Sequence, residues 1–178
     1  MLPALPRYGR SSLLFFEDFS PWLCASSLSA GKKLKAVGWL ELGKPYARRE
    51  RELPETCFVQ LLRLLERPWE PFHYMGSHEC EFCSGEPRVE GYVEGYIERY
   101  RLKVHFGANN LYLPAEGCVY VAPSMMAHYV DAHSYEPPAA FWEAVMKCPE
   151  MCSEAYMQAL IANGPSTEGW VRAVQAGG

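Results

Sequence analysis

The stretch that decides the fold class is residues 92–106, which read Tyr-Val-Glu-Gly-Tyr-Ile-Glu-Arg-Tyr-Arg-Leu-Lys-Val-His-Phe. Its even-numbered positions are mostly apolar or aromatic, and a period of two favours strands over a helix. Gly91, Gly95 and the 107–109 segment are expected as turns or bulges. Residues 34–41, 111–113 and 118–121 add further short strands. We therefore predict a small, mostly antiparallel sheet.

Helical patterns flank these strands. Residues 55–67 have apolar side chains at helical spacing and end before Pro68, which predicts one amphipathic helix ahead of the cysteine motif. After the strands, the sequence predicts two to three helices: one opened by Pro123, one over 138–147 and one over 150–162. Together with the strands they define an α+β fold class.

The ends of the chain have weaker patterns. Residues 1–33 are rich in aromatic residues, Ser and Pro, and we expect an irregular arm that packs on the domain. Residues 166–178 are expected to form a loosely held tail with Trp170 as its anchor. Because 178 residues suit one domain and no linker composition is visible, we predict a single domain over 1–178.

The charge pattern limits the classes of partner. The formal net charge is −4 and both signs are interspersed, whereas a nucleic-acid-binding protein needs a basic face. The densest basic stretch, Lys44 to Arg51, contains Glu50 and is interpreted as a solvated linker face. No stretch approaches the roughly 20 apolar residues of a membrane span. We expect neither nucleic acid nor membrane as a partner.

The cysteines indicate the compartment. Their number is seven, their spacing is irregular, and the chain is longer than most disulfide-stapled mini-proteins. The short apolar run 13–16 is followed at once by Glu17 and Asp18, which is not the pattern of a secretory signal. We therefore expect a reduced, cytoplasmic protein.

Cys80 and Cys83 form the clearest functional motif. They are separated by two residues, a spacing that lets both thiolates bind one metal ion from a tight turn. His78 stands two residues before the first cysteine, and His128 and His133 follow later as His-x4-His. Two thiolates and two neutral imidazoles around Zn²⁺ make a neutral group, which is easier to bury than a charged one. We predict a structural zinc site.

Two points about this site stay open. The histidines rank as His128, then His133, then His78, and a set of His78, Cys80, Cys83 and His128 is as defensible as one with both later histidines. Residues five apart on an ideal helix point in different directions, so His128 and His133 can share a metal only if the helix loosens near its end. A redox dithiol and two unrelated buried cysteines are the competing interpretations.

The remaining histidines and cysteines have ordinary explanations. His73 and His105 are expected as strand or surface residues. Cys148 and Cys152 lie one helical turn apart with no histidine close in sequence, so core filling is favoured over a second metal site. Cys24 and Cys118 are expected to be buried in the same way.

Three segments together resemble a group of small bacterial proteins without known activity. They are Gly38-Trp39-Leu40, the run Gly-Ser-His-Glu-Cys-Glu-Phe-Cys over 76–83, and the run His-Tyr-Val-Asp-Ala-His-Ser-Tyr-Glu-Pro-Pro over 128–138. The resemblance covers about residues 36 to 147. It implies a common fold and a shared metal site, and it implies no mechanism.

Three function classes follow from these patterns. The leading hypothesis is a non-enzymatic, zinc-stabilised protein that binds another protein, one version being an immunity protein that neutralises a toxin. The alternative is a metal-dependent hydrolase, with Glu79, Glu81 or Asp131 as a conceivable general base but with no catalytic residue assigned. The third is a thiol-redox or metal sensor that uses Cys80 and Cys83.

Overall fold

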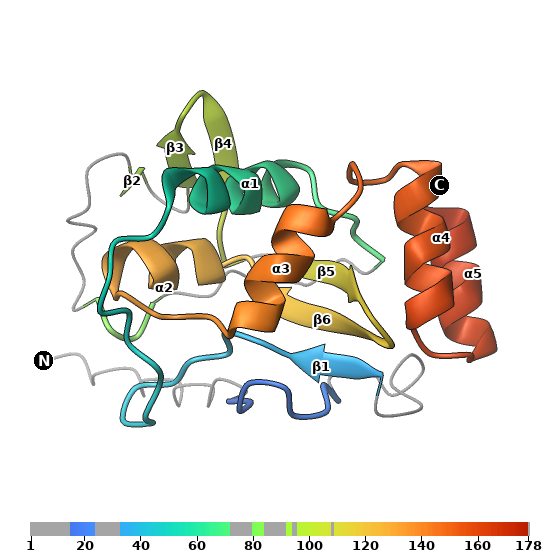
Figure 1. The fold of residues 1–178 in the computed structure, drawn as a ribbon, viewed down its shortest axis with the longest axis horizontal. Coiled ribbons are helices and arrows are strands. Elements are labelled where there is room, and N and C mark those ends of the chain that lie inside the picture. Colours follow the sequence, from blue (N-terminus) through green and yellow to red (C-terminus); the bar gives the residue numbers. More distant parts are fainter. Residues whose placement is uncertain are drawn as a thin grey trace, which may run out of the picture.

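The structure, a computed structural model, describes residues 15–23, 33–71, 80–83, 92–93, 96–107 and 109–177. These parts of the chain form an α+β fold with two small sheets and five helices (Figure 1). The first sheet has the strand order β1-β6-β5, and the second has the order β2-β3-β4. The fold class agrees with the prediction from the sequence.

The first sheet is mixed rather than purely antiparallel, and the described strands form two sheets rather than the predicted one. β5 (Asn110–Ala115) and β6 (Cys118–Pro123) form an antiparallel hairpin. β1 (Leu34–Ala36) pairs with β6 in parallel, although more than 80 residues separate them along the chain. Local hydrophobic pattern identifies a strand but not the direction of a partner so far away, because both directions bury the same side chains.

The second sheet consists of β2 (Tyr92–Val93), β3 (Tyr96–Arg99) and β4 (Leu102–His105), all antiparallel. Its tight turn lies at Tyr100 and Arg101, whose φ angles are 55° and 64°. Two-residue hairpin turns with positive φ at both central positions usually carry Asn or Gly. The sequence shows neither residue there, which is why periodicity alone continues the strand through this turn.

The β1-β6-β5 sheet is covered on both faces. One face carries Leu111, Leu113 and Tyr120 into a core with α1 (Glu55–Glu66), α2 (Met126–Ala132) and α3 (Ala139–Lys147). The other face carries Tyr112 and Val121 into a second core with α4 (Glu154–Asn163) and α5 (Glu168–Ala176). Burial on both faces explains why β5 and β6 are almost continuously apolar rather than alternating.

The C-terminal segment is a helix and not the predicted loose tail. Thr167 is the N-cap residue of α5, and its hydroxyl accepts a hydrogen bond from the backbone N–H of Trp170 at 3.3 Å. Trp170 is fully buried, as expected of the anchor, and lies edge-on to Trp69 with ring centroids 5.6 Å apart. The described part of the chain therefore has four helices after the cysteine motif rather than two to three. The longest described helix has 12 residues, and none could cross a membrane.

The described part of the N-terminal arm, residues 15–23, is irregular and packs on the first sheet. Pro21 forms an isolated bridge with Lys35, and Trp22 is completely buried. Asp18 accepts hydrogen bonds from the Tyr135 hydroxyl and from the backbone N–H of Gly38, at 2.8 and 2.9 Å. The arm therefore contacts segments that are far apart in the sequence.

Candidate metal centre

The cysteine motif forms a tight turn. The backbone N–H of Cys83 donates to the carbonyl of Cys80 at 3.3 Å, and both side chains are half-buried. Burial raises the pKa of the Cys80 thiol to about 12, while the backbone N–H groups of Phe82 and Cys83 that point at its sulfur act in the opposite direction. Such N–H groups stabilise a thiolate, which is the form that binds metal.

The two residues between the cysteines hold the turn in place. The ring of Phe82 lies edge-on to Tyr46 and Tyr129, with centroids 5.5 and 5.8 Å apart. The carboxylate of Glu81 accepts a hydrogen bond from the backbone N–H of Leu42 at 3.0 Å. The anchoring role of Phe82 was not predicted from the sequence, because an aromatic residue between two cysteines has no distinctive local pattern.

The two later histidines come from the end of α2. His128 lies within the helix and is only 4% exposed. His133 is the C-cap residue, with φ −114° and ψ 8°, and its N–H bonds to the Tyr129 carbonyl at 3.2 Å. Ser134 then has a positive φ of 53°. α2 thus ends after His128 and just before His133. This end is the departure from ideal helix geometry that lets two histidines five residues apart bind one metal ion.

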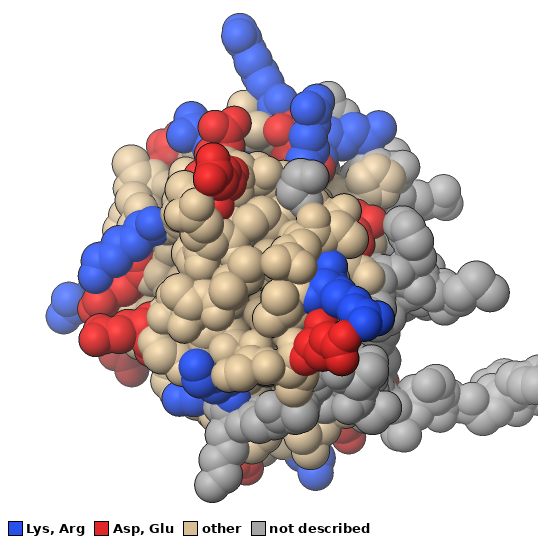
Figure 2. Space-filling model, turned by 90° about the vertical axis from the view of Figure 1, so that its right-hand side faces the viewer, with Lys and Arg blue, Asp and Glu red and all other residues tan. Residues whose placement is uncertain are grey.

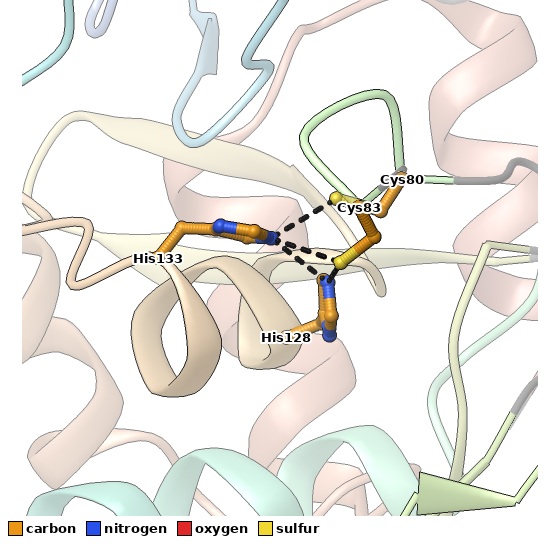
Figure 3. A group of neighbouring side chains, drawn as sticks. All are labelled: Cys80, Cys83, His128 and His133. Atoms are coloured by element: carbon orange, nitrogen blue, oxygen red, sulfur yellow. Dashed lines mark hydrogen bonds between the residues drawn. The ribbon is translucent and has the colours of Figure 1, made fainter. Parts of the chain in front are cut away.

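Four ligand atoms converge at this point (Figure 3). The Nε2 atom of His133 lies 3.2 Å from Cys80 Sγ, 3.3 Å from Cys83 Sγ and 3.1 Å from His128 Nε2. The Nε2 atom of His128 lies 3.3 Å from Cys83 Sγ. All four atoms fit within 4.8 Å of one another.

Hydrogen bonding alone does not account for this convergence. A neutral imidazole nitrogen carries either one proton or one lone pair, so His133 Nε2 can form one good hydrogen bond and not three. A tetrahedral zinc with Zn–N of about 2.0–2.1 Å and Zn–S of about 2.3 Å places its ligand atoms about 3.3–3.8 Å apart. The observed spacings are only a few tenths of an ångström shorter. The four residues therefore fit a metal ion bound by two sulfurs and two nitrogens.

The electrostatic environment keeps both imidazoles neutral. Burial, assisted by the neighbouring His133, lowers the pKa of His128 to about 4. Burial also lowers the pKa of His133, and the charge of Arg48 acts in the same direction. A neutral imidazole is the form that binds a metal, so these two side chains are ready as ligands at neutral pH.

A comparison with protein families identifies the chain. Residues 14–146 match the model of a family described as "Domain of unknown function (DUF7919)". The chain belongs to this DUF7919 family. No curated protein and no solved structure matches the chain. All four converging side chains lie inside the DUF7919 region, whereas α4 and α5 lie after it.

Within the DUF7919 region, residues 46–49 hold the end of α2 from the other side. The Tyr46 hydroxyl donates to the carbonyl of His133 at 3.4 Å, and the Arg49 guanidinium donates to the carbonyl of Val130 at 3.1 Å. The backbone N–H of Arg49 bonds to Ser134 and that of Glu136 bonds to Ala47. Arg49 is thus part of the support for His133 and not of a purely solvated face, because its guanidinium donates to the last carbonyls of a helix.

The other predicted residues fall into three groups. His78, His73, Glu79 and Cys24 lie outside the described residues, so the ligand set with His78 stays a prediction. His105 is exposed on β4 and Cys118 is buried, as expected. Cys148 packs against both cores, but Cys152 is exposed, so core filling is wrong for Cys152. Residues 151–153 form a turn before α4, so Cys152 is not on a helix as its spacing from Cys148 suggested.

Proposed function

We propose that Cys80, Cys83, His128 and His133 bind one structural zinc ion. The observation that carries this proposal is the convergence of two sulfurs and two nitrogens within 4.8 Å of one another, with four of the atom pairs 3.1–3.3 Å apart. Thiolate and imidazole donors in a tetrahedron favour zinc over the hard cations, which prefer oxygen ligands. With two thiolates the zinc centre is neutral, which suits its half-buried position.

The donor set argues for a structural rather than a catalytic ion. Four protein donors complete a tetrahedron, whereas a zinc hydrolase keeps one position open for water. The metal would join the 80–83 turn to the end of α2, two segments more than 40 residues apart. A redox dithiol is disfavoured, because reactive cysteines have a lowered pKa and burial raises that of Cys80 to about 12.

We further propose that the protein acts by binding another protein, and that a toxin-neutralising immunity protein is the specific form of this function. The support is a surface suited to contact. The centre of the face formed by α4 and α5 carries few charged side chains (Figure 2). Its exposed α4 residues include Ala155, Gln158, Ile161 and Ala162. Interface cores are depleted of charge in this way. Cysteines that must stay reduced to bind zinc suit a reducing compartment, so a cytoplasmic location is part of the proposal.

Metal analysis tests the zinc site. Inductively coupled plasma mass spectrometry of protein purified without chelators should find about one zinc per chain. Removal of the zinc should lower the melting temperature in one cooperative transition, since structural zinc contributes about 10–16 kcal/mol in isolated zinc-finger peptides. A protein without metal would refute the zinc proposal. A bound zinc whose removal leaves the melting temperature unchanged would favour the hydrolase.

The partner is tested separately. The tagged protein should retain a specific protein in affinity purification from its native cell, and the purified pair should form a stable complex by gel filtration. For the immunity form, the partner should be a toxin whose activity falls when the complex forms. A purified partner that does not bind directly would contradict the proposed protein binding. A toxin that stays active in the complex would contradict the proposed immunity function.

A further inference from the structure

A groove of about 700 Å³ lies along α3, beside the segment that leads from the metal site into that helix. Its apolar part is formed by Pro137 and Pro138 at the helix start and by Trp142 and Met146 on the helix. Met146 is 50% exposed, so its side chain is accessible to a ligand. Prolines make a stiff wall, so little conformational entropy would be lost when a ligand covers it.

The rim of the groove is acidic. Asp18, Glu136 and Glu143 contribute three carboxylates, against the single ammonium of Lys147. Lys147 already pairs with Glu143 at 3.5 Å across one helical turn, and both side chains are largely exposed. The unbalanced negative charge therefore belongs to Asp18 and Glu136. Glu136 lies beside the 46–49 segment, because its backbone N–H bonds to the carbonyl of Ala47.

Trp142 is suited to a contact residue. Its ring is half-buried and lines the groove. Its indole N–H is shielded from water and has no acceptor among the described residues. No hydrogen bond to a described residue therefore fixes the orientation of the indole ring. Tryptophan and methionine are also enriched where proteins bind one another.

The groove and the metal centre share one structural segment. Glu136 is three residues after His133, and its backbone N–H bonds to the carbonyl of Ala47 at 2.9 Å. The neighbouring Tyr46 donates to the carbonyl of His133. Ala47 and Glu136 both line the groove. A metal that holds His133 therefore also holds one wall of the groove.

We propose, on the basis of the zinc-stabilised binding function, that this groove is the docking site for a partner segment that carries Arg or Lys beside an apolar side chain. Charge complementarity selects this chemistry, because a carboxylate rim attracts cations and repels acidic peptides. The apolar side chain lies against Trp142 and Met146, and the cation lies against Asp18 and Glu136. Zinc keeps the groove wall in its binding form.

A short peptide tests the groove directly. The probe is a fluorescein-labelled octapeptide of alternating arginine and leucine, and the control replaces every arginine by glutamate. Fluorescence anisotropy with the zinc-loaded full chain should show binding of the arginine peptide alone, weakening at high salt as exposed charges are screened. Glu136→Gln removes one of the two carboxylates that contact the cation, and Glu143→Gln leaves the Lys147 ammonium unpaired. Together the two changes should weaken binding about tenfold. The matched control, Glu52→Gln with Glu116→Gln, removes two exposed carboxylates elsewhere and should change nothing.

The apolar contact has its own pair of variants. Met146→Ala should lower the affinity several-fold, while Leu23→Ala, which shortens an exposed side chain in the N-terminal arm, should not. Both positions are on the surface, so neither change is expected to unfold the protein. Equal binding by all these variants, or no binding of the arginine peptide, would overturn the groove proposal.

A chelation experiment separates the groove from the zinc site. Peptide affinity should fall when zinc is removed and return when zinc is added back. If the protein binds zinc but not the peptide, the groove proposal fails and the metal proposal stands. If the purified protein has no zinc and the Glu136/Glu143 variant still binds the peptide more weakly, the metal proposal fails and the groove stands without its metal link.

Discussion

At the scale of single residues, the His133 nitrogen is the most informative atom of the protein. It lies within 3.3 Å of two sulfurs and a second imidazole nitrogen, and one nitrogen cannot form three hydrogen bonds. Its position depends on the end of α2 and on Tyr46, neither of which is part of a metal-binding sequence motif. Whether His133 can reach the other three donors thus depends on its backbone conformation at the end of α2.

Single substitutions should identify the ligands. Cys80→Ser, Cys83→Ser, His128→Ala and His133→Ala should each lower the zinc content well below one per chain, because each removes a donor from the tetrahedron. His105→Ala, on exposed β4, is the control and should keep the zinc. His78→Ala should also keep it, since four donors already converge. Loss of zinc in His78→Ala with full retention in His133→Ala would reverse this assignment. The measurement is metal content by mass spectrometry.

Zinc affinity should decrease as the pH falls. Metal binding must displace the proton of each thiol, and burial raises the pKa of Cys80 to about 12. Acid also destabilises the folded metal-free protein. The pKa of His128 in the folded protein, about 4, lies below the ordinary 6.5, so pH values below about 6 favour the unfolded chain. Competition with a chromogenic chelator should give a slope of about two in log affinity per pH unit between pH 6 and 8. An affinity independent of pH there would exclude thiolate ligands.

At the scale of elements, the corner between α4 and α5 shows how two short helices are held together. Gly164 ends α4, and its backbone N–H bonds to the carbonyl of Leu160 at 2.9 Å. The Trp170 indole donates to the same carbonyl at 3.1 Å. A Cβ atom on Gly164 would come within 2.5 Å of this oxygen and would also contact the indole ring. Neither group can move away, because one is backbone and the other is fully buried.

Gly164→Ala should therefore lower the free energy of unfolding by about 3 kcal/mol, from steric overlap and a weakened hydrogen bond. Gly43→Ala is the matched control: its φ is +88° but nothing lies within 4 Å of a new Cβ. It should cost only the about 1 kcal/mol of left-handed backbone strain. Urea unfolding followed by tryptophan fluorescence measures both. A cost for Gly164→Ala no larger than that for Gly43→Ala would show that the corner can relax.

At the scale of the whole molecule, Asp18 joins three distant segments. Both carboxylate oxygens accept from the Tyr135 hydroxyl at 2.8 Å, and one also accepts from the backbone N–H of Gly38. Tyr135 is fully buried and lies two residues after His133. The N-terminal arm, the segment after β1 and the segment after the metal site therefore meet at one carboxylate.

Tyr135→Phe and Asp18→Asn should each lower the free energy of unfolding by about 1.5–3 kcal/mol, the usual contribution of a hydrogen bond to a charged group. The double variant should cost clearly less than the sum, since both changes remove the same interaction. Tyr100→Phe, at a tyrosine that is 45% exposed, serves as control and should be neutral. Additive costs in the double variant would show that the two side chains are not coupled. Chemical denaturation of the four proteins provides the test.

The sequence by itself determined the elements whose signals are local. The helix over 55–66 has apolar residues at helical spacing, and the hairpin strands at 110–115 and 118–123 surround an obvious turn. Cys80 and Cys83 are also evident, because two thiols at this spacing are within reach of one ion whatever surrounds them. The same holds for the α+β class, which depends only on the order of these patterns.

Only the tertiary structure decided what depends on distant partners. The parallel pairing of β1 with β6 and the docking of α5 through Trp170 are set by residues far away in the chain. The meeting of His133 with His128 depends on where α2 ends, and Tyr46, Arg49 and Phe82 hold that end and the cysteine turn in place. Local sequence favours conformations of single segments, whereas long-range packing selects which segments meet. The metal centre needs both.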